Sequence, residues 1–102
     1  MTQTLEIHTI PVISTAHITE EVSRRLSDGS GQWCACADYV GCGFFLYLDE
    51  PHGTECDPVP QCLLDIRDWR KRLQLEGRLD NSCWVRLECD ADPVEGLPVY
   101  DW

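Results

Sequence analysis

Basic residues are scarce in this chain. Its 102 residues include eight Lys and Arg against eighteen Asp and Glu, which gives a formal net charge of -10. No Lys or Arg occurs between Arg25 and Arg67, a stretch that holds seven of the acids. A surface of this sign repels the phosphates of nucleic acids and anionic membranes, and it speeds encounters with basic proteins. The composition therefore argues against direct binding to DNA, RNA or membranes and favours a basic protein surface as the partner.

Long apolar runs and a leader-like N-terminus are also missing. No stretch approaches the roughly 20 apolar residues that a transmembrane helix needs. The first ten residues carry no Lys or Arg, unlike a secretory signal peptide. Hydrophobic residues still make up 43% of the chain, with four Trp, three Tyr and two Phe, which is enough for one modest core. We therefore expect a single compact domain over residues 1–102 that is soluble and cytoplasmic.

No catalytic motif is recognised. A nucleophilic cysteine needs a nearby base and an electropositive setting that lowers its pKa, and the negative field of this chain acts in the opposite direction. The glycines at residues 29–31 and 41–43 lack the Lys of a phosphate-binding loop. His17, beside a predicted helix start, is expected to have a structural role. The sequence therefore predicts a non-enzymatic protein without catalytic residues.

Seven cysteines leave three interpretations open: buried small hydrophobes, a metal site, or reactive thiols. The odd number and the absence of an export signal disfavour a disulfide framework, and burial is the default for a free Cys. Structural zinc sites usually place two to four residues between paired cysteines, whereas the only close pair here has one residue between its members. We expect no cofactor, with zinc as the alternative; its candidate ligands are Cys34, Cys36, His52 and Cys56.

The first half of the chain predicts three strands and a helix. Residues 5–13 are β-rich, and Pro11 within them suits an edge strand or a bend. A short helix follows, with Thr19 as its N-cap. Residues 33–37 suggest a brief strand, and the aromatic run at residues 43–48 is typical of a central strand buried on both faces.

The second half predicts a longer helix and a last strand. Apolar residues from Val59 to Leu73 follow the helical period, with Gly77 as a C-cap. Residues 83–88 alternate like a strand, and the aromatic residues 97–102 are expected to pack back on the domain. The fold class is α+β: a small, mainly antiparallel sheet of three to four strands with two helices packed on one face.

Basic residues do gather on and just after the longer helix. Acids are interleaved with them, so pairing within the helix is expected rather than contact with nucleic acid. Asp68 and Arg72, one helical turn apart, form such an expected pair. The clustered residues are Arg67, Arg70, Lys71, Arg72 and Arg78.

Three parts of the chain resemble a family of small uncharacterised proteins encoded on bacterial plasmids, integrative elements and prophages. They are the ISTAHITEE segment at residues 13–21, GFFLYL at residues 43–48, and WVRL at residues 84–87 through GLPVYDW at residues 96–102. The cysteine-rich residues 33–62 depart from the pattern. The resemblance implies no activity for any residue. It implies a genetic context in which proteins that blunt host restriction or CRISPR defence are common.

Acidity and this context together give the functional hypothesis. We expect a non-enzymatic protein-binding accessory factor of a mobile genetic element, an anti-CRISPR or anti-restriction inhibitor that acts by nucleic-acid mimicry on a host defence protein. The alternatives are a small zinc-stabilised adaptor or interaction domain with Cys and His ligands, and a cysteine enzyme with one reactive thiol. A monomer and a homodimer both stay open. The predicted contact residues are Asp49, Glu50, Glu55, Asp57, Asp90, Asp92 and Glu95.

Overall fold

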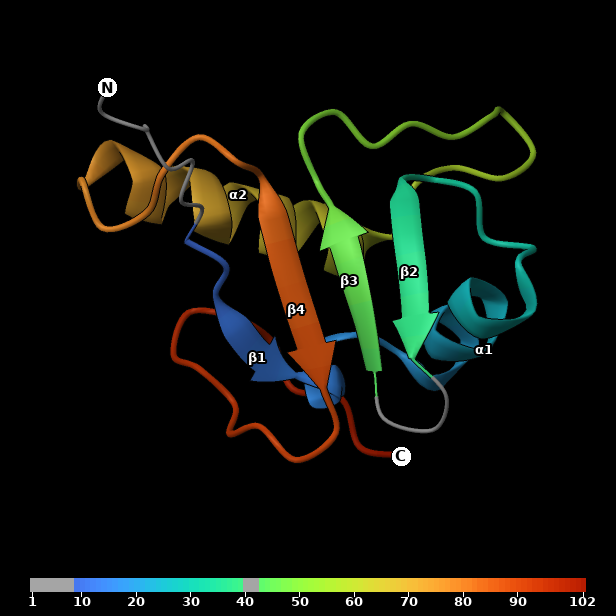
Figure 1. The fold of residues 1–102 in the computed structure, drawn as a ribbon. Helices are drawn as coiled ribbons and strands as arrows, with labels where there is room; N and C mark the ends of the chain where they lie inside the picture. Colours follow the sequence, from blue (N-terminus) through green and yellow to red (C-terminus); the bar gives the residue numbers. More distant parts are fainter. Residues whose placement is uncertain (1–8, 40–42) are drawn as a thin grey trace, which may run out of the picture.

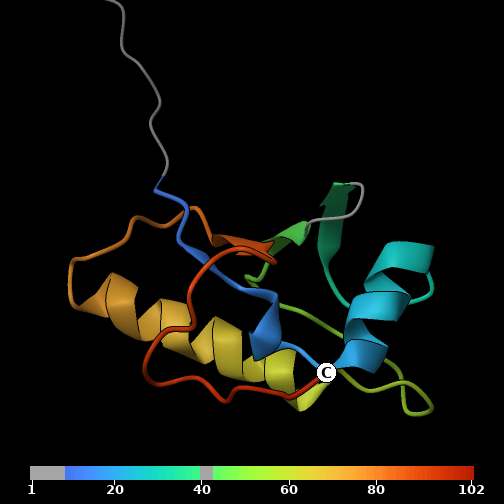
Figure 2. The same cartoon turned by 90° about the horizontal axis from the view of Figure 1, so that it is seen from below.

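The computed structural model describes residues 9–39 and 43–102 and contains a four-stranded sheet with two helices on one of its sides (Figures 1 and 2). The sheet order is β1-β4-β3-β2; β3 runs antiparallel to both neighbours, whereas β1 and β4 are parallel. This confirms the predicted α+β class and the mainly antiparallel sheet. The elements in chain order are β1 (Val12–Ser14), the 3-10 turn η1 (Thr15–His17), α1 (Glu20–Asp28), β2 (Ala35–Tyr39), β3 (Gly43–Tyr47), α2 (Gln61–Leu75) and β4 (Trp84–Glu88).

Strand β3 is central, as predicted, but it is not buried on both faces. Phe44 and Leu46 point to the helices and are 4% and 0% exposed. On the opposite face Tyr47 is 36% exposed and Phe45 is half-buried. The prediction of double burial was wrong because both helices lie on the same side of the sheet, as Figure 2 shows. The core is therefore a single layer between that side of the sheet and the helices.

Helix α1 begins and ends where its local signals predict. The Thr19 hydroxyl accepts a hydrogen bond from the Val22 N–H at 3.2 Å, which satisfies one of the free N–H groups of the first turn. Gly29 ends the helix in the left-handed region at φ 82. Val22 and Leu26, one turn apart, are buried. The helix therefore places Arg25 near the loop that follows β3.

Helix α2 begins directly after Pro60, whose carbonyl accepts from the Leu63 and Leu64 N–H groups. Gly77, at φ 76, follows its C-terminus as predicted. One ion pair differs from the prediction: Asp68 binds the adjacent Arg67 at 2.9 Å rather than Arg72. The buried face of the helix comprises Cys62, Leu63, Ile66, Trp69 and Arg70.

The C-terminal segment packs back on the domain, as expected. Leu97 is buried, the Tyr100 N–H donates to the Ala16 carbonyl at 2.8 Å, and the Trp102 indole N–H donates to the Ile18 carbonyl at 3.0 Å. These bonds join residues 97–102 to η1, beside the edge strand β1. Among the described residues, no helix combines the length and apolar character that a bilayer span requires.

Candidate protein-binding surface

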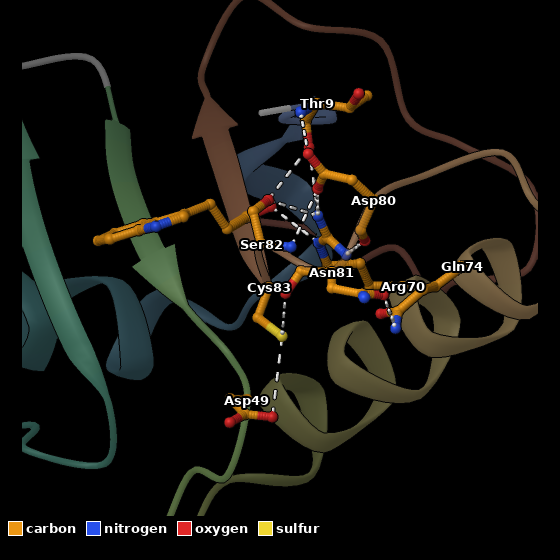
Figure 3. Close-up of polar contacts among 9 residues, drawn as sticks. Thr9, Asp49, Arg70, Gln74, Asp80, Asn81, Ser82 and Cys83 are labelled. Atoms are coloured by element: carbon orange, nitrogen blue, oxygen red, sulfur yellow. Dashed lines mark hydrogen bonds and ion pairs between the residues drawn. The ribbon is translucent and has the colours of Figure 1, made fainter. Parts of the chain in front are cut away.

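Arg70 fixes the connection between α2 and β4. Its guanidinium is 2% exposed and lies among oxygen acceptors (Figure 3). It donates to the carbonyls of Trp84 at 2.9 Å, Asp80 at 3.1 Å and Thr9 at 3.2 Å. It also reaches the Ser82 hydroxyl at 3.0 Å and the Asp80 carboxylate at 3.4 Å. Arg70 is thus buried and holds the α2–β4 connection in place, and it does not share an exposed basic surface with the other cations of the helix.

Cys83 and Asp49 join this connection to the loop after β3. Figure 3 shows the Cys83 thiol directed at Asp49, with an S–O distance of 3.7 Å, while the Asn81 carbonyl accepts at 3.5 Å. Cys83 adopts φ 63, a conformation that residues other than glycine rarely take. Burial, followed by the charge of Asp49, raises the pKa of the Cys83 thiol. A protonated thiol is a poor nucleophile, so this contact positions Asp49 rather than activating Cys83.

The first acidic loop, residues 49–57, presents three carboxylates to solvent. Asp49, Glu50 and Glu55 are exposed, and none of them forms an ion pair with a described residue. Asp57 differs, because the Arg25 guanidinium donates to both of its carboxylate oxygens at 2.7 Å. These hydrogen bonds hold the pKa of the Asp57 carboxyl below its ordinary value of 3.8. The structure therefore commits Asp57 to an internal contact.

The Arg25–Asp57 pair also ties α1 to the first acidic loop. The Arg25 guanidinium lies 4.6 Å from the centre of the Trp33 ring, and Trp33 is 2% exposed. The His52 N–H donates to the Trp33 carbonyl at 2.9 Å. The Arg25–Asp57 pair and the hydrogen bond from His52 to Trp33 thus hold the loop in place. The backbone of the loop that carries the exposed carboxylates is therefore held in a defined position.

The second acidic loop, residues 89–96, follows β4. Asp90, Asp92 and Glu95 are exposed and form no ion pair with any residue that the structure describes. Because β3 and β4 are antiparallel neighbours, the loops that follow them lie at opposite ends of the sheet (Figure 1). The structure therefore places the predicted contact residues in two groups, one at each end of the sheet.

His17 anchors the segment after the second acidic loop. Its imidazole is 1% exposed; Nε2 accepts from the Val94 N–H at 2.9 Å, and Nδ1 lies 2.8 Å from the Pro98 carbonyl. Because Nε2 must accept, the proton is on Nδ1 and is donated to Pro98. Both ring nitrogens are therefore occupied by hydrogen bonds. This geometry supports the structural role predicted for His17.

Ion pairs within the chain neutralise most of its positively charged side chains. Within the described part of the chain, five of the eight basic residues pair with acids. The exposed carboxylates of the two acidic loops therefore lack compensating cations among the described residues. The pairs are Arg25–Asp57, Arg67–Asp68, Arg70–Asp80, Arg78–Glu76 and Arg86–Glu88.

The candidate zinc ligands lie at different depths. Cys34 is half-buried, and burial raises the pKa of its thiol to about 12, whereas Cys36, His52 and Cys56 are exposed. Over residues 9–39 and 43–102, no three His, Cys, Asp or Glu side chains form a group that could hold a metal ion. Burial as the default for cysteine was wrong for most of them: Cys62 alone is buried among the six described, and Cys42 lies outside the described residues.

Comparisons with known proteins place the chain within one family. Residues 10–102 match the profile of DUF5983, a family of unknown function, over its C-terminal domain. The match begins just before β1 and includes every helix and strand described above. Neither the curated proteins nor the solved structures contain a match to this chain.

Proposed function

Because the chain belongs to the DUF5983 family, whose function is unknown, we propose its function from its surface: an acidic, non-enzymatic factor that binds a basic surface of another protein. One observation carries the proposal. Six exposed carboxylates in two loops form no ion pair with any described residue, while five of the eight basic residues pair with acids of the described part of the chain. The chain supplies little of its own countercharge, which favours a cationic partner. The six residues are Asp49, Glu50, Glu55, Asp90, Asp92 and Glu95.

The spacing of the two loops supports nucleic-acid mimicry. Strand β3 has five residues, so the loops at the two ends of the sheet are separated by about 17 Å. That distance is of the same order as the roughly 12 Å width of the DNA major groove, which separates the two phosphate backbones. A basic cleft that grips nucleic acid along two backbones can therefore meet both loops at once.

The host process belongs to the same proposal. The resemblance of residues 13–21, 43–48 and 84–102 to proteins of plasmids, integrative elements and prophages supports an origin on a mobile genetic element. On such an element, an inhibitor of a restriction or CRISPR protein protects the incoming DNA. We therefore assign the partner to the nucleic-acid-binding proteins of bacterial defence, and the place of action to the cytoplasm.

Phage plaque formation on defended hosts tests the proposal. The chain is expressed in strains with an active restriction or CRISPR system, and plaques are counted against undefended strains. We expect rescue that is lost in the variant Asp49→Asn, Glu50→Gln, Glu55→Gln. A second triple variant, Asp90→Asn, Asp92→Asn, Glu95→Gln, should lose it as well.

A matched control separates position from total charge. Neutralising three other exposed acids, by Glu20→Gln, Glu21→Gln and Asp101→Asn, changes the net charge by the same amount as either loop variant. Rescue should persist in this control. Absence of rescue across several defence systems would refute the inhibitor, and equal loss in all three variants would refute the assignment to the two loops.

A further inference from the structure

The face of the sheet turned away from the helices is apolar. Figure 1 looks onto this face, with α2 behind the strands. The register places Val12, Arg86, Phe45 and Ala37 in one row across the four strands. Ile10, just before β1, lies beside the end of a second row. We call the following residues the open face: Ile10, Val12, Ala35, Ala37, Phe45, Tyr47, Trp84 and Arg86.

The open face contains a shallow apolar hollow. Ile10, Ala37, Phe45 and Trp84 line a cavity of about 310 Å³. The Tyr47 ring packs edge-on against Trp84, with centroids 5.2 Å apart. Aromatic side chains that are accessible and rigidly packed are common anchors of protein interfaces. The hollow therefore suits an apolar side chain of a partner.

The open face holds one charged residue, Arg86, and this residue is paired, in contrast to the exposed acids of the two loops. Arg86 lies 5.6 Å from the centre of the Phe45 ring and pairs with Glu88 at 3.3 Å. Ile10 and Val12 are 37% and 45% exposed. An exposed apolar patch lowers the solubility of a protein, so solubility does not account for it. Apolar patches of this kind more often serve binding.

The two acidic loops lie beyond the two ends of the open face. Asp49 follows β3 at one end, and Asp90 follows β4 at the other. The arrangement is an apolar, aromatic centre with carboxylates on opposite sides. Protein interfaces have this anatomy: a core depleted in charge within a polar rim.

We propose that the open face is the centre of a docking surface for a protein whose own contact region has an apolar centre flanked by Lys and Arg. Charge complementarity selects this occupant. A second copy would bring another net charge of -10, and two sheets packed at about 30° would align their acidic ends. The inference rests on the function proposed for the two loops, and it adds the open face, which lies between them, as a further contact surface for the partner.

A model peptide tests the open face without the natural partner. The peptide Lys-Lys-Leu-Thr-Val-Thr-Val-Thr-Leu-Lys-Lys supplies an apolar centre between two lysine pairs, and its binding is followed by calorimetry. The variant Ala37→Glu places a carboxylate in the hollow at an exposed position. Gln32→Glu adds the same charge at an exposed position outside the open face and serves as its control. Circular dichroism verifies that both variants fold.

We expect the peptide to bind the parent chain and the Gln32→Glu variant equally, and the Ala37→Glu variant about tenfold more weakly. Replacing its lysines by glutamates should abolish binding. Equal affinity for Ala37→Glu, or no binding to the parent, would overturn the inference. A dimer that sedimentation detects in the parent but not in Ala37→Glu would also overturn it, with a second copy as the occupant. Failure of the plaque assay alongside peptide binding would refute only the defence role.

Discussion

Arg70 joins three parts of the chain that are distant in sequence. Its guanidinium donates hydrogen bonds to the carbonyl of Thr9, which precedes β1 in the sequence. It also donates to the carbonyls of Asp80 and Trp84, which follow α2 in the sequence. Breaking a buried ionic contact by removing one partner leaves the other groups without compensation. The residue therefore stabilises the end of the sheet that carries the first acidic loop.

Replacing Arg70 by Met should destabilise the fold by about 3–5 kcal/mol, because the carbonyls around it would lose a buried donor and the Asp80 carboxylate would lose its ion pair. Urea unfolding measures the free energy of unfolding of the parent and the variant. The exposed Arg72 on the same helix serves as the control, and Arg72→Met should change the free energy by less than about 0.5 kcal/mol. Equal effects at both positions would contradict the framework role of Arg70.

Asp57 makes stability depend on pH in an acidic window. The pKa of its carboxyl is lowered by the hydrogen bonds from Arg25, so the charged form favours the folded state. This contribution is present above the unfolded pKa and is lost as pH falls through the folded pKa, below the ordinary value of 3.8. The difference in thermal stability between the parent and Asp57→Asn should therefore be largest near neutral pH and shrink toward pH 2. A difference that stays constant with pH would contradict the contribution of this charge.

At the scale of the element, the cap of α1 is a local interaction with a predictable size. The Thr19 hydroxyl is bonded to the Val22 N–H, and Thr19→Ala removes that acceptor. We expect a loss of about 1 kcal/mol in the free energy of unfolding, with most of it restored by Thr19→Ser, which keeps the hydroxyl. Chemical denaturation of the three proteins measures both effects. Similar loss in the Ser and Ala variants would show that the methyl group, not the cap, matters.

The sequence predicted the features whose causes are local. The hydroxyl of Thr19, the glycine after each helix and the alternation in β4 act within a few residues, so the order and type of the elements could be foreseen. The covered side of β3 could not be foreseen, because an apolar run does not tell how many faces the helices cover. The aromatic content predicted that residues 97–102 pack on the domain. It did not predict the hydrogen bonds from Tyr100 and Trp102 that hold them there.

Long-range partners were beyond the sequence. Arg25 pairs with Asp57, 32 residues away, and His17 binds Val94, 77 residues away. Charge alone does not distinguish Asp57, which is committed internally, from Glu55, which is exposed without an ion pair to a described residue. The sequence also did not show how far apart the two acidic segments lie, which the antiparallel arrangement of β3 and β4 decides by placing them at opposite ends of the sheet.

At the scale of the whole molecule, the net charge of -10 and the two acidic loops predict binding that depends steeply on salt. Exposed charges interact over a Debye length of about 10 Å at 0.1 M salt and about 3 Å at 1 M. The affinity for the defence protein that the plaque assay identifies should therefore fall by at least about tenfold between 0.05 and 0.5 M NaCl. Calorimetry over a salt series measures this slope. Neutralising either loop should flatten it, whereas contact through the open face alone would leave the affinity nearly independent of salt, because burial of apolar surface is not weakened by screening.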